Sequence, residues 1–327
     1  MSSASARKSA KETIYTVLRT PEIGTFIGVI AIYAIISAIN PRFISPGSIL
    51  TVIRWFVALS LLTMGQSMVL ISGAIDLSVG SMASLSSMIF AYLLVYGGQS
   101  PLVAFIAVIA TGLLVGLYHG FFVTRFSPPL PTIVPAFIIT LGSYILLRGI
   151  GIVMTSGIPI KITDREAIAF IASDTGRIII FVIMLIISLI IQRYTLVGRY
   201  MYAVGGNMEA ARIAGIPIHK TRVFAFAFSA ISASIGGLLF AGLIAGGYAD
   251  IAIGQELYSI ASCAIGGVSL AGGEGTVIGA VLGALLISVI RNGIVSLGVS
   301  PYYQDVVTAI ILIGAVTVDL IRRTWRR

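Results

Sequence analysis

Long apolar segments separated by short polar connections run through almost the whole chain. Six or more of them approach or exceed the roughly 20 residues that cross a bilayer as a helix. Breaks at Gly and Pro divide the segments into spans, because both residues interrupt helices. The predicted fold is an all-α integral membrane protein with Gly-interrupted helices. We predict ten spans, at residues 23–39, 49–72, 79–96, 101–123, 132–153, 177–192, 223–246, 257–272, 276–297 and 303–321.

The polar segments define the domain organisation. Residues 1–22 carry four basic residues and no long apolar run, which indicates a cytoplasmic leader. Residues 23–321 form one predicted transmembrane domain, and residues 322–327 a basic cytoplasmic tail. Within the domain, residues 154–176 are too polar to span the membrane. The polar connection at 193–222 is far longer than the other cytoplasmic connections.

Composition favours a membrane protein over a soluble one. Of the 327 residues, 57% are hydrophobic and 10% are charged, whereas a soluble domain carries about 25% charged residues. Such a chain cannot cover a water-facing surface, so lipid is its main solvent. The single cysteine, Cys263, excludes an intramolecular disulfide, and two histidines offer little for a metal site. We expect no cofactor in this chain.

The net charge of +9 is explained by topology. If the N-terminus is in the cytoplasm, ten spans place four segments there: residues 1–22, 124–131, 193–222 and the tail after Asp319. These segments hold 14 of the 21 Lys and Arg residues, in agreement with the positive-inside rule. Both termini are therefore predicted to be cytoplasmic, and the basic residues are predicted to contact anionic lipid and not nucleic acid.

The 193–222 connection contains a predicted short helix with caps at both ends. Asn207 is a good N-cap, and Glu209 lies in the first turn, where a carboxylate complements the helix dipole. Gly215 ends the helix. A narrow helix on the cytoplasmic face suits a groove on a partner protein, although an ordinary connector would show the same pattern. The candidate contact residues are Gly205, Gly206, Asn207, Glu209, Ala210, Ala211 and Gly215.

Glycine and polar residues interrupt the apolar pattern at two places. Residues 72–81 set Asp76 between two apolar stretches, where an ionisable residue is either a functional group or a cap of the following helix. Residues 265–275 contain five glycines, which either mark a pathway between two pseudo-repeats or permit close helix packing. The candidate pathway or helix-break residues are Asp76, Ser78, Gly80, Ser269 and Asn292.

No catalytic machinery is recognisable in the sequence. The phosphate-loop motif Gly-x-x-x-x-Gly-Lys-[Ser/Thr] does not occur. The two histidines, His119 and His219, form no nucleophile–base arrangement with a neighbouring group. We therefore expect no catalytic residue and no metal site, and any ATP hydrolysis must take place on another chain.

Six blocks of sequence resemble the permeases of bacterial ribose-type monosaccharide ABC importers. The blocks are SGAIDLSVGS at 72–81, PAFIITL at 135–141 with LRG at 147–149, GRYMYAVGGN at 198–207, EAARIAG at 209–215, GGVSLAGGEG at 266–275 and YYQ at 302–304. Similarity runs in order from about residue 23 to 320, so it covers nearly the whole chain. One departure is Ala74, where many relatives have a second Gly, and it makes the backbone stiffer at this break.

The resemblance implies a permease subunit of an ATP-driven monosaccharide importer in the bacterial inner membrane. It implies about ten spans per subunit and alternating access in a pair of permeases, formed with a second copy or a paralogue. An ABC ATPase subunit and an extracytoplasmic sugar-binding protein are the other implied partners. The 207–215 helix then resembles the coupling helix that seats in the ATPase.

Two other functions compete with this interpretation. An ion-coupled secondary transporter of small polar solutes needs buried carboxylates, and Asp76 is the only central one in the predicted spans. An intramembrane enzyme is the third possibility, against which the lack of a paired catalytic set argues.

Overall fold

The computed structural model describes residues 21–125, residues 133–300 and scattered positions between 302 and 317. The predicted leader at 1–22 lies almost wholly outside the described residues, and the tail at 322–327 lies entirely outside them. The tenth predicted span, residues 303–321, is described only in part and is helical where it is described.

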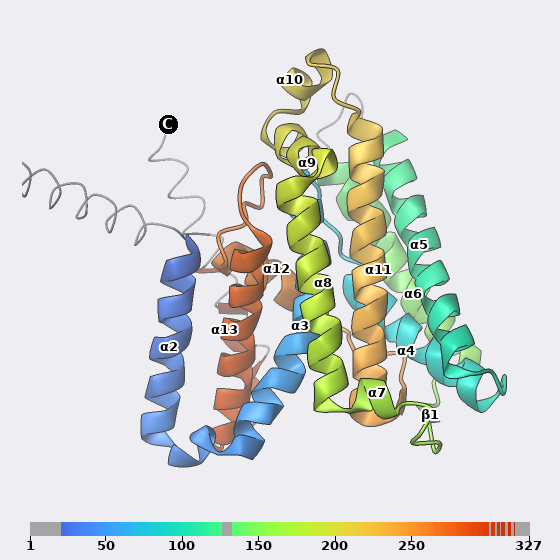
Figure 1. The fold of residues 1–327 in the computed structure, drawn as a ribbon, viewed down its shortest axis with the longest axis vertical. Coiled ribbons are helices and arrows are strands. Elements are labelled where there is room, and N and C mark those ends of the chain that lie inside the picture. The colour runs from blue at the N-terminus through green and yellow to red at the C-terminus, as the bar shows by residue number, and fades with distance from the viewer. Residues whose placement is uncertain are drawn as a thin grey trace, which may run out of the picture.

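The described chain is helical nearly throughout (Figure 1). Seven of its helices are long and apolar enough to cross a membrane, and they are α2, α3, α5, α6, α8, α11 and α13. The elements in chain order are α2 (Pro21–Ile39), the 3-10 helix η1 (Pro41–Ile44), α3 (Pro46–Ile71), α4 (Val79–Val95), α5 (Pro101–Arg125), α6 (Ile133–Thr155), β1 (Ile160–Lys161), α7 (Ala169–Ala172), α8 (Asp174–Tyr194), α9 (Leu196–Gly206), α10 (Met208–Ile213), α11 (Ile218–Ile244), β2 (Gly246–Gly247), α12 (Gln255–Ile265) and α13 (Val277–Ser296).

Helix α11 is the centre of the bundle. It packs against α3, α4 and α5, and 78% of its most apolar window is buried. Three glycines spaced four residues apart on α5, at positions 112, 116 and 120, lie against it, and a Cβ at any of them would overlap α11. Small residues at this spacing let two helices approach closely in a membrane, where packing drives association.

One end of the bundle carries α10, and the other carries α7 and β1 (Figure 1). Strand β1 pairs with β2 in an antiparallel register, with Ile160 opposite Gly247. The prediction that residues 154–176 do not span is confirmed, because residues 156–173 form β1, α7 and connecting turns between α6 and α8. We refer to these two ends of the bundle as the α10 end and the β1 end.

The eighth predicted span, residues 257–272, is wrong as a continuous helix. Helix α12 has 11 residues, which is about 16 Å at 1.5 Å per residue and too short for a hydrocarbon core of about 30 Å. The helix stops because Gly267 adopts a left-handed φ of +84°. Residues 266–276 then form an irregular glycine-rich loop.

Candidate functional site

The predicted short helix in the 193–222 connection is confirmed as α10. The side chain of Asn207 caps it by accepting a hydrogen bond of 2.9 Å from the backbone N–H of Ala210. Gly215 follows the helix with φ +76°, a conformation that glycine adopts without strain. Its N–H donates to the carbonyl of Arg212 at 3.0 Å. The caps predicted from the sequence therefore fix both ends of the helix.

Helix α10 projects from the end of the bundle (Figure 1), and its residues are exposed except for the half-buried Met208 and the buried Ala211, which was predicted as a contact residue. Glu209 and Arg212 pair at 2.6 Å on its surface. The hydrogen bonds from Arg212 lower the pKa of the Glu209 carboxyl below its ordinary value. Ile213, the last helical residue, is 79% exposed. The helix thus presents a charged pair and an apolar side chain with no partner among the described residues to cover them.

Three glycine-containing segments meet where α9 ends. Gly205 lies so close to Ile71 at the end of α3 that a Cβ on it would overlap the Ile71 carbonyl oxygen. Gly273, in the loop after α12, donates its N–H to the same carbonyl at 2.9 Å. Gly73 and Gly272 complete the contact. We call Gly73, Gly205, Gly272 and Gly273 the glycine junction.

Tyr202 adds a second link between α9 and the loop that follows α12. Its hydroxyl donates to the carbonyl of Gly275 at 2.6 Å. Burial raises the pKa of Tyr202 above its ordinary value, which keeps the phenol protonated and able to donate. The segment that leads into α10 is therefore tied to two interrupted parts of the bundle.

The first interruption, residues 72–78, runs along α11 towards its middle. Ser72 accepts long hydrogen bonds of 3.4 Å from Arg222 near the start of α11, and Asp76 accepts from Ser229 at 3.1 Å. Arg222 and Ser229 are seven residues apart on α11, which corresponds to about 10 Å along the helix axis. The chain after α3 therefore turns back into the bundle. Helix α4 then begins near the middle of α11.

Asp76 holds this interruption together and is fully buried. One carboxylate oxygen accepts from the backbone N–H of Ser78 at 2.9 Å and from its hydroxyl at 2.6 Å. The other oxygen accepts from Ser229. Burial of a carboxylate is tolerated when several donors satisfy it. These contacts favour the structural role that the sequence left open for Asp76.

The second interruption is residues 245–254, which the sequence did not predict. Ala245 adopts a left-handed φ of +51° and ends α11. The chain then runs back along α4, where Tyr248 lies beside Ser87 and the N–H of Ala252 donates to Ser84 at 3.0 Å. The two interpretations of residues 265–275, a pseudo-repeat of 72–81 or close helix packing, stay predictions. The glycines in 246–254 are scattered among apolar residues, so the pattern looked like the end of a span.

The short helices α4 and α12 meet through their N-termini. Gly80 in the first turn of α4 lies against Glu256 in the first turn of α12, and a Cβ on Gly80 would overlap the Glu256 carboxylate. Glu256 is 6% exposed, and it accepts a hydrogen bond of 3.0 Å from the N–H of Gly254. The expectation that Asp76 is the only central carboxylate is therefore wrong. The predicted eighth span began at Leu257 and left Glu256 outside.

Ser269 has a local role in the loop after α12. Its hydroxyl accepts from the N–H of Ala271 at 3.1 Å, and its own N–H donates to Glu274 at 3.1 Å. These bonds shape the turn that brings Gly272 and Gly273 to the glycine junction.

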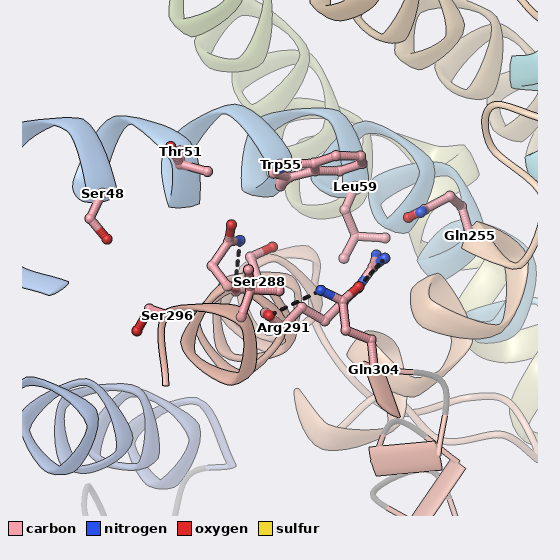
Figure 2. A pocket seen from close by; sticks show the side chains of 11 residues that line it. Ser48, Thr51, Trp55, Leu59, Gln255, Ser288, Arg291, Ser296 and Gln304 are labelled. Atoms are coloured by element: carbon pink, nitrogen blue, oxygen red, sulfur yellow. Dashed lines mark hydrogen bonds between the residues drawn. The ribbon is translucent and has the colours of Figure 1, made fainter. Parts of the chain in front are cut away.

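A cavity of about 350 Å³ lies between α3, α12 and α13. It follows α3 from Ser48 to Leu59, about three turns, and Figure 2 shows Ser48 at one end and Gln255 at the other. The cavity therefore runs from the β1 end of α3 towards the first residue of α12. Asn292 lines it, whereas Asp76, Ser78, Gly80 and Ser269 do not.

Polar and aromatic groups line this cavity. Arg291 lies 4.0 Å from the ring centre of Tyr258 and 5.7 Å from that of Trp55. It donates to the side chain of Gln304 at 3.1 Å (Figure 2). Trp55 and Gln255 were not predicted from the sequence, because each is a single polar or aromatic residue near one end of an apolar segment.

Comparisons with known proteins agree with this architecture. The family described as "Branched-chain amino acid transport system / permease component" matches residues 48–316. The ribose import permease protein RbsC of Haemophilus influenzae is 34% identical over 90% of this chain and 92% of its own. RbsC of Escherichia coli (strain K12) is 32% identical with the same coverage. The autoinducer 2 import system permease protein LsrC of Enterobacter sp. (strain 638) is 31% identical over 93% of this chain and 88% of its own.

No solved structure matches the chain. The family match covers most of the sequence, and the relatives align along nearly their full length. A permease component of an ABC system has no ATPase activity of its own, and these components are multi-pass proteins of the bacterial inner membrane. The chain belongs to this family of ABC import permeases.

Proposed function

We propose that this permease imports a monosaccharide and that α10 is the helix through which an ATPase subunit drives it. The observation that carries the proposal is the position of α10, which is capped at both ends, exposed, and joined through α9 to the glycine junction. A displacement of α10 is thereby passed to the ends of α3 and of the loop after α12. Relatives named as ribose permeases support a sugar as the substrate.

This proposal sets the orientation of the molecule. The α10 end faces the cytoplasm with both chain termini, and the β1 end faces an extracytoplasmic sugar-binding protein. Two permease subunits, identical or paralogous, form the translocation pathway and alternate between inward and outward access as rigid bodies. Residues 23–321 form the permease domain, between the leader at 1–22 and the tail at 322–327, and no cofactor is needed in this chain.

Two substitutions in the α10 region test the proposal. Glu209→Lys replaces the ion pair with Arg212 by a repulsive pair, and Gly215→Pro is incompatible with a φ of +76°. We expect both to abolish co-purification with the ATPase subunit and ATP-dependent sugar uptake. Glu166→Lys makes the same charge change on an exposed residue near β1, at the opposite end of the bundle, and leaves co-purification with the ATPase subunit intact.

The same experiment separates the competing functions. Wild-type association and uptake in both α10 variants would show that α10 is not the coupling helix. Uptake into vesicles that contain the permease alone, driven by an ion gradient, would favour a secondary transporter that uses Asp76 and Glu256.

A further inference from the structure

The cavity between α3, α12 and α13 lies on the side of the bundle from which an imported solute arrives. It extends from Ser48, near the start of α3, to Gln255, the first residue of α12. Its volume of about 350 Å³ lies at the lower end of the about 300–1,000 Å³ that small-molecule sites occupy. The cavity therefore has the size for a small solute and reaches the point where the two short helices meet.

Gln255 supplies a buried acceptor that lacks a donor. Its side chain is 4% exposed, and its Oε1 has no hydrogen-bond partner in the described part of the chain. Figure 2 shows the carboxamide extending from α12 towards Leu59, at the inner end of the cavity. A buried carbonyl oxygen without a donor costs about 1–3 kcal/mol. A solute hydroxyl at this position removes that cost.

Asn292 and Trp55 provide complementary contacts. The Asn292 amide donates one N–H to the carbonyl of Ser288 at 2.8 Å, which leaves its second N–H and its carbonyl oxygen for other partners. Trp55 places an indole ring along the same cavity. Amides that both donate and accept, next to a flat apolar ring, match a molecule with many hydroxyls on one side and C–H groups on the other.

The charged side chain at the cavity argues against a cationic solute. Arg291 is the charged side chain among the lining residues, and no Asp or Glu lines the cavity within the described residues. An ammonium group in the cavity would lie close to the Arg291 guanidinium, and the two like charges would repel each other. Glu256 is next to Gln255 in sequence but packs against Gly80 and caps α12 through Gly254. Its carboxylate already occupies the N-terminus of α12, where an anionic solute would otherwise bind.

We propose that this cavity is a binding site for an uncharged polyhydroxylated solute of monosaccharide size. Gln255 and Asn292 form the hydrogen bonds, and Trp55 packs against the C–H face. The inference rests on the proposed function of sugar import and assigns part of the substrate selectivity to the permease itself.

Intrinsic fluorescence provides a direct test, because Trp55 and Trp325 are the two tryptophans of the chain. In the full chain with Trp325→Phe, reconstituted in lipid nanodiscs, Trp55 is the single reporter. We would titrate it with D-ribose, D-glucose, L-leucine and D-ribose 5-phosphate. We expect a saturable change with at least one of the two sugars and none with leucine or the phosphate ester.

Matched variants locate the response. Gln255→Leu weakens sugar binding about fivefold or more, since one buried hydrogen bond is lost. Gln99→Leu makes the same change on an exposed turn and leaves binding unchanged. Asn292→Leu is the second pocket variant and replaces Gln255→Leu if the latter no longer assembles with the ATPase subunit. Equal binding in both pocket variants overturns the proposal, as does an equal or stronger response to leucine or the phosphate ester.

A labelling experiment gives an independent readout. Thr51→Cys places a thiol on the exposed α3 wall of the cavity, and the natural Cys263 is fully buried. A membrane-impermeant thiol reagent added from outside should modify this variant, and the bound sugar should slow the reaction. The absence of both fluorescence response and protection overturns the binding site. ATP-dependent uptake by the wild-type importer in that case leaves the proposed function intact.

Discussion

The two interruptions of the bundle, residues 72–78 and 245–254, have the same geometry but are stabilised by different interactions. Each follows a long helix, and each ends at the N-terminus of a short helix that begins inside the bundle. The first is held by buried hydrogen bonds to the Asp76 carboxylate. The second is held by the β1–β2 pair, by backbone hydrogen bonds to Ser84 and Ser87 of α4, and by an ion pair at 2.6 Å between the partly exposed side chains of Asp250 and Arg148.

This difference indicates that the two ends of the bundle differ in rigidity. Buried hydrogen bonds to a charged group are strong and costly to leave unmade, whereas a solvent-exposed ion pair contributes little. The first interruption also contacts the glycine junction, so it connects the core to α10. We therefore expect the α10 side of the core to resist change more than the β1 side. Four substitutions test this expectation, and we give them in order of decreasing effect.

Gly80→Val acts where both interruptions meet and should have the largest effect. Its side chain would overlap the Glu256 carboxylate and the backbone carbonyl of Ala252, which separates α4 from α12. Overpacking of this kind costs about 3 kcal/mol or more. We expect loss of a folded, monodisperse permease in size-exclusion chromatography and of ATP-dependent uptake.

Gly142→Val is the matched control for that substitution. A Cβ at Gly142 in α6 has no neighbour within 4 Å, so this variant should fold and transport normally. Normal folding of Gly80→Val would show that the α4 and α12 termini are not in close contact.

Asp76→Ala breaks the first interruption alone. It leaves the buried N–H and hydroxyl of Ser78 and the hydroxyl of Ser229 without their acceptor. Each buried donor left unpaired costs about 1–3 kcal/mol, so the thermal unfolding midpoint should fall clearly. Asp76→Asn keeps an acceptor oxygen and should recover part of the loss. An equal midpoint for Ala and wild type would contradict the structural role.

Asp250→Asn weakens the second interruption. The pair with Arg148 leaves 43% of the Arg148 side chain and 31% of the Asp250 side chain exposed, so solvent already screens it. We expect a slight fall in the unfolding midpoint, much smaller than that of Asp76→Ala. A larger fall than for Asp76→Ala would reverse the ranking of the two interruptions.

Glu209→Gln touches neither interruption and should have the smallest effect on stability. Arg212 lowers the pKa of Glu209, so the ionised pair contributes above the ordinary carboxyl pKa near 4. That contribution is lost only as the pH falls through the lowered folded-state value. The difference in unfolding midpoint between variant and wild type should therefore be constant between about pH 5 and pH 8. A difference that changed within this range would indicate another titrating group near α10.

Local signals in the sequence were enough to predict the α10 region. Asn207 and Gly215 act on neighbouring backbone groups, so their roles follow from spacing alone. Gln255 and Glu256 were missed for the opposite reason. Their importance comes from contact with Gly80 and with α3, which lie about 175 to 200 residues earlier in the chain, and no local period reveals such a contact.

Span prediction failed in the same way at residues 257–272. Apolar composition reports burial in lipid or protein, and it does not distinguish a crossing helix from a short helix followed by a loop enclosed by other helices. Nearly all the long helices elsewhere in the chain were predicted to within a few residues, because each is an unbroken apolar run with Pro or a polar cap at its start.

The glycine junction has a consequence for natural variation. Its contacts are made by main-chain atoms, and a methyl group at Gly205, Gly272 or Gly273 would overlap a neighbouring backbone. Such a contact offers no side chain for selection to adjust. The cavity residues can be substituted as the substrate changes, whereas any larger residue at these glycines would clash with the backbone. A comparison of orthologues should therefore find variable residues around Trp55 and Gln255 and invariant glycines at the glycine junction.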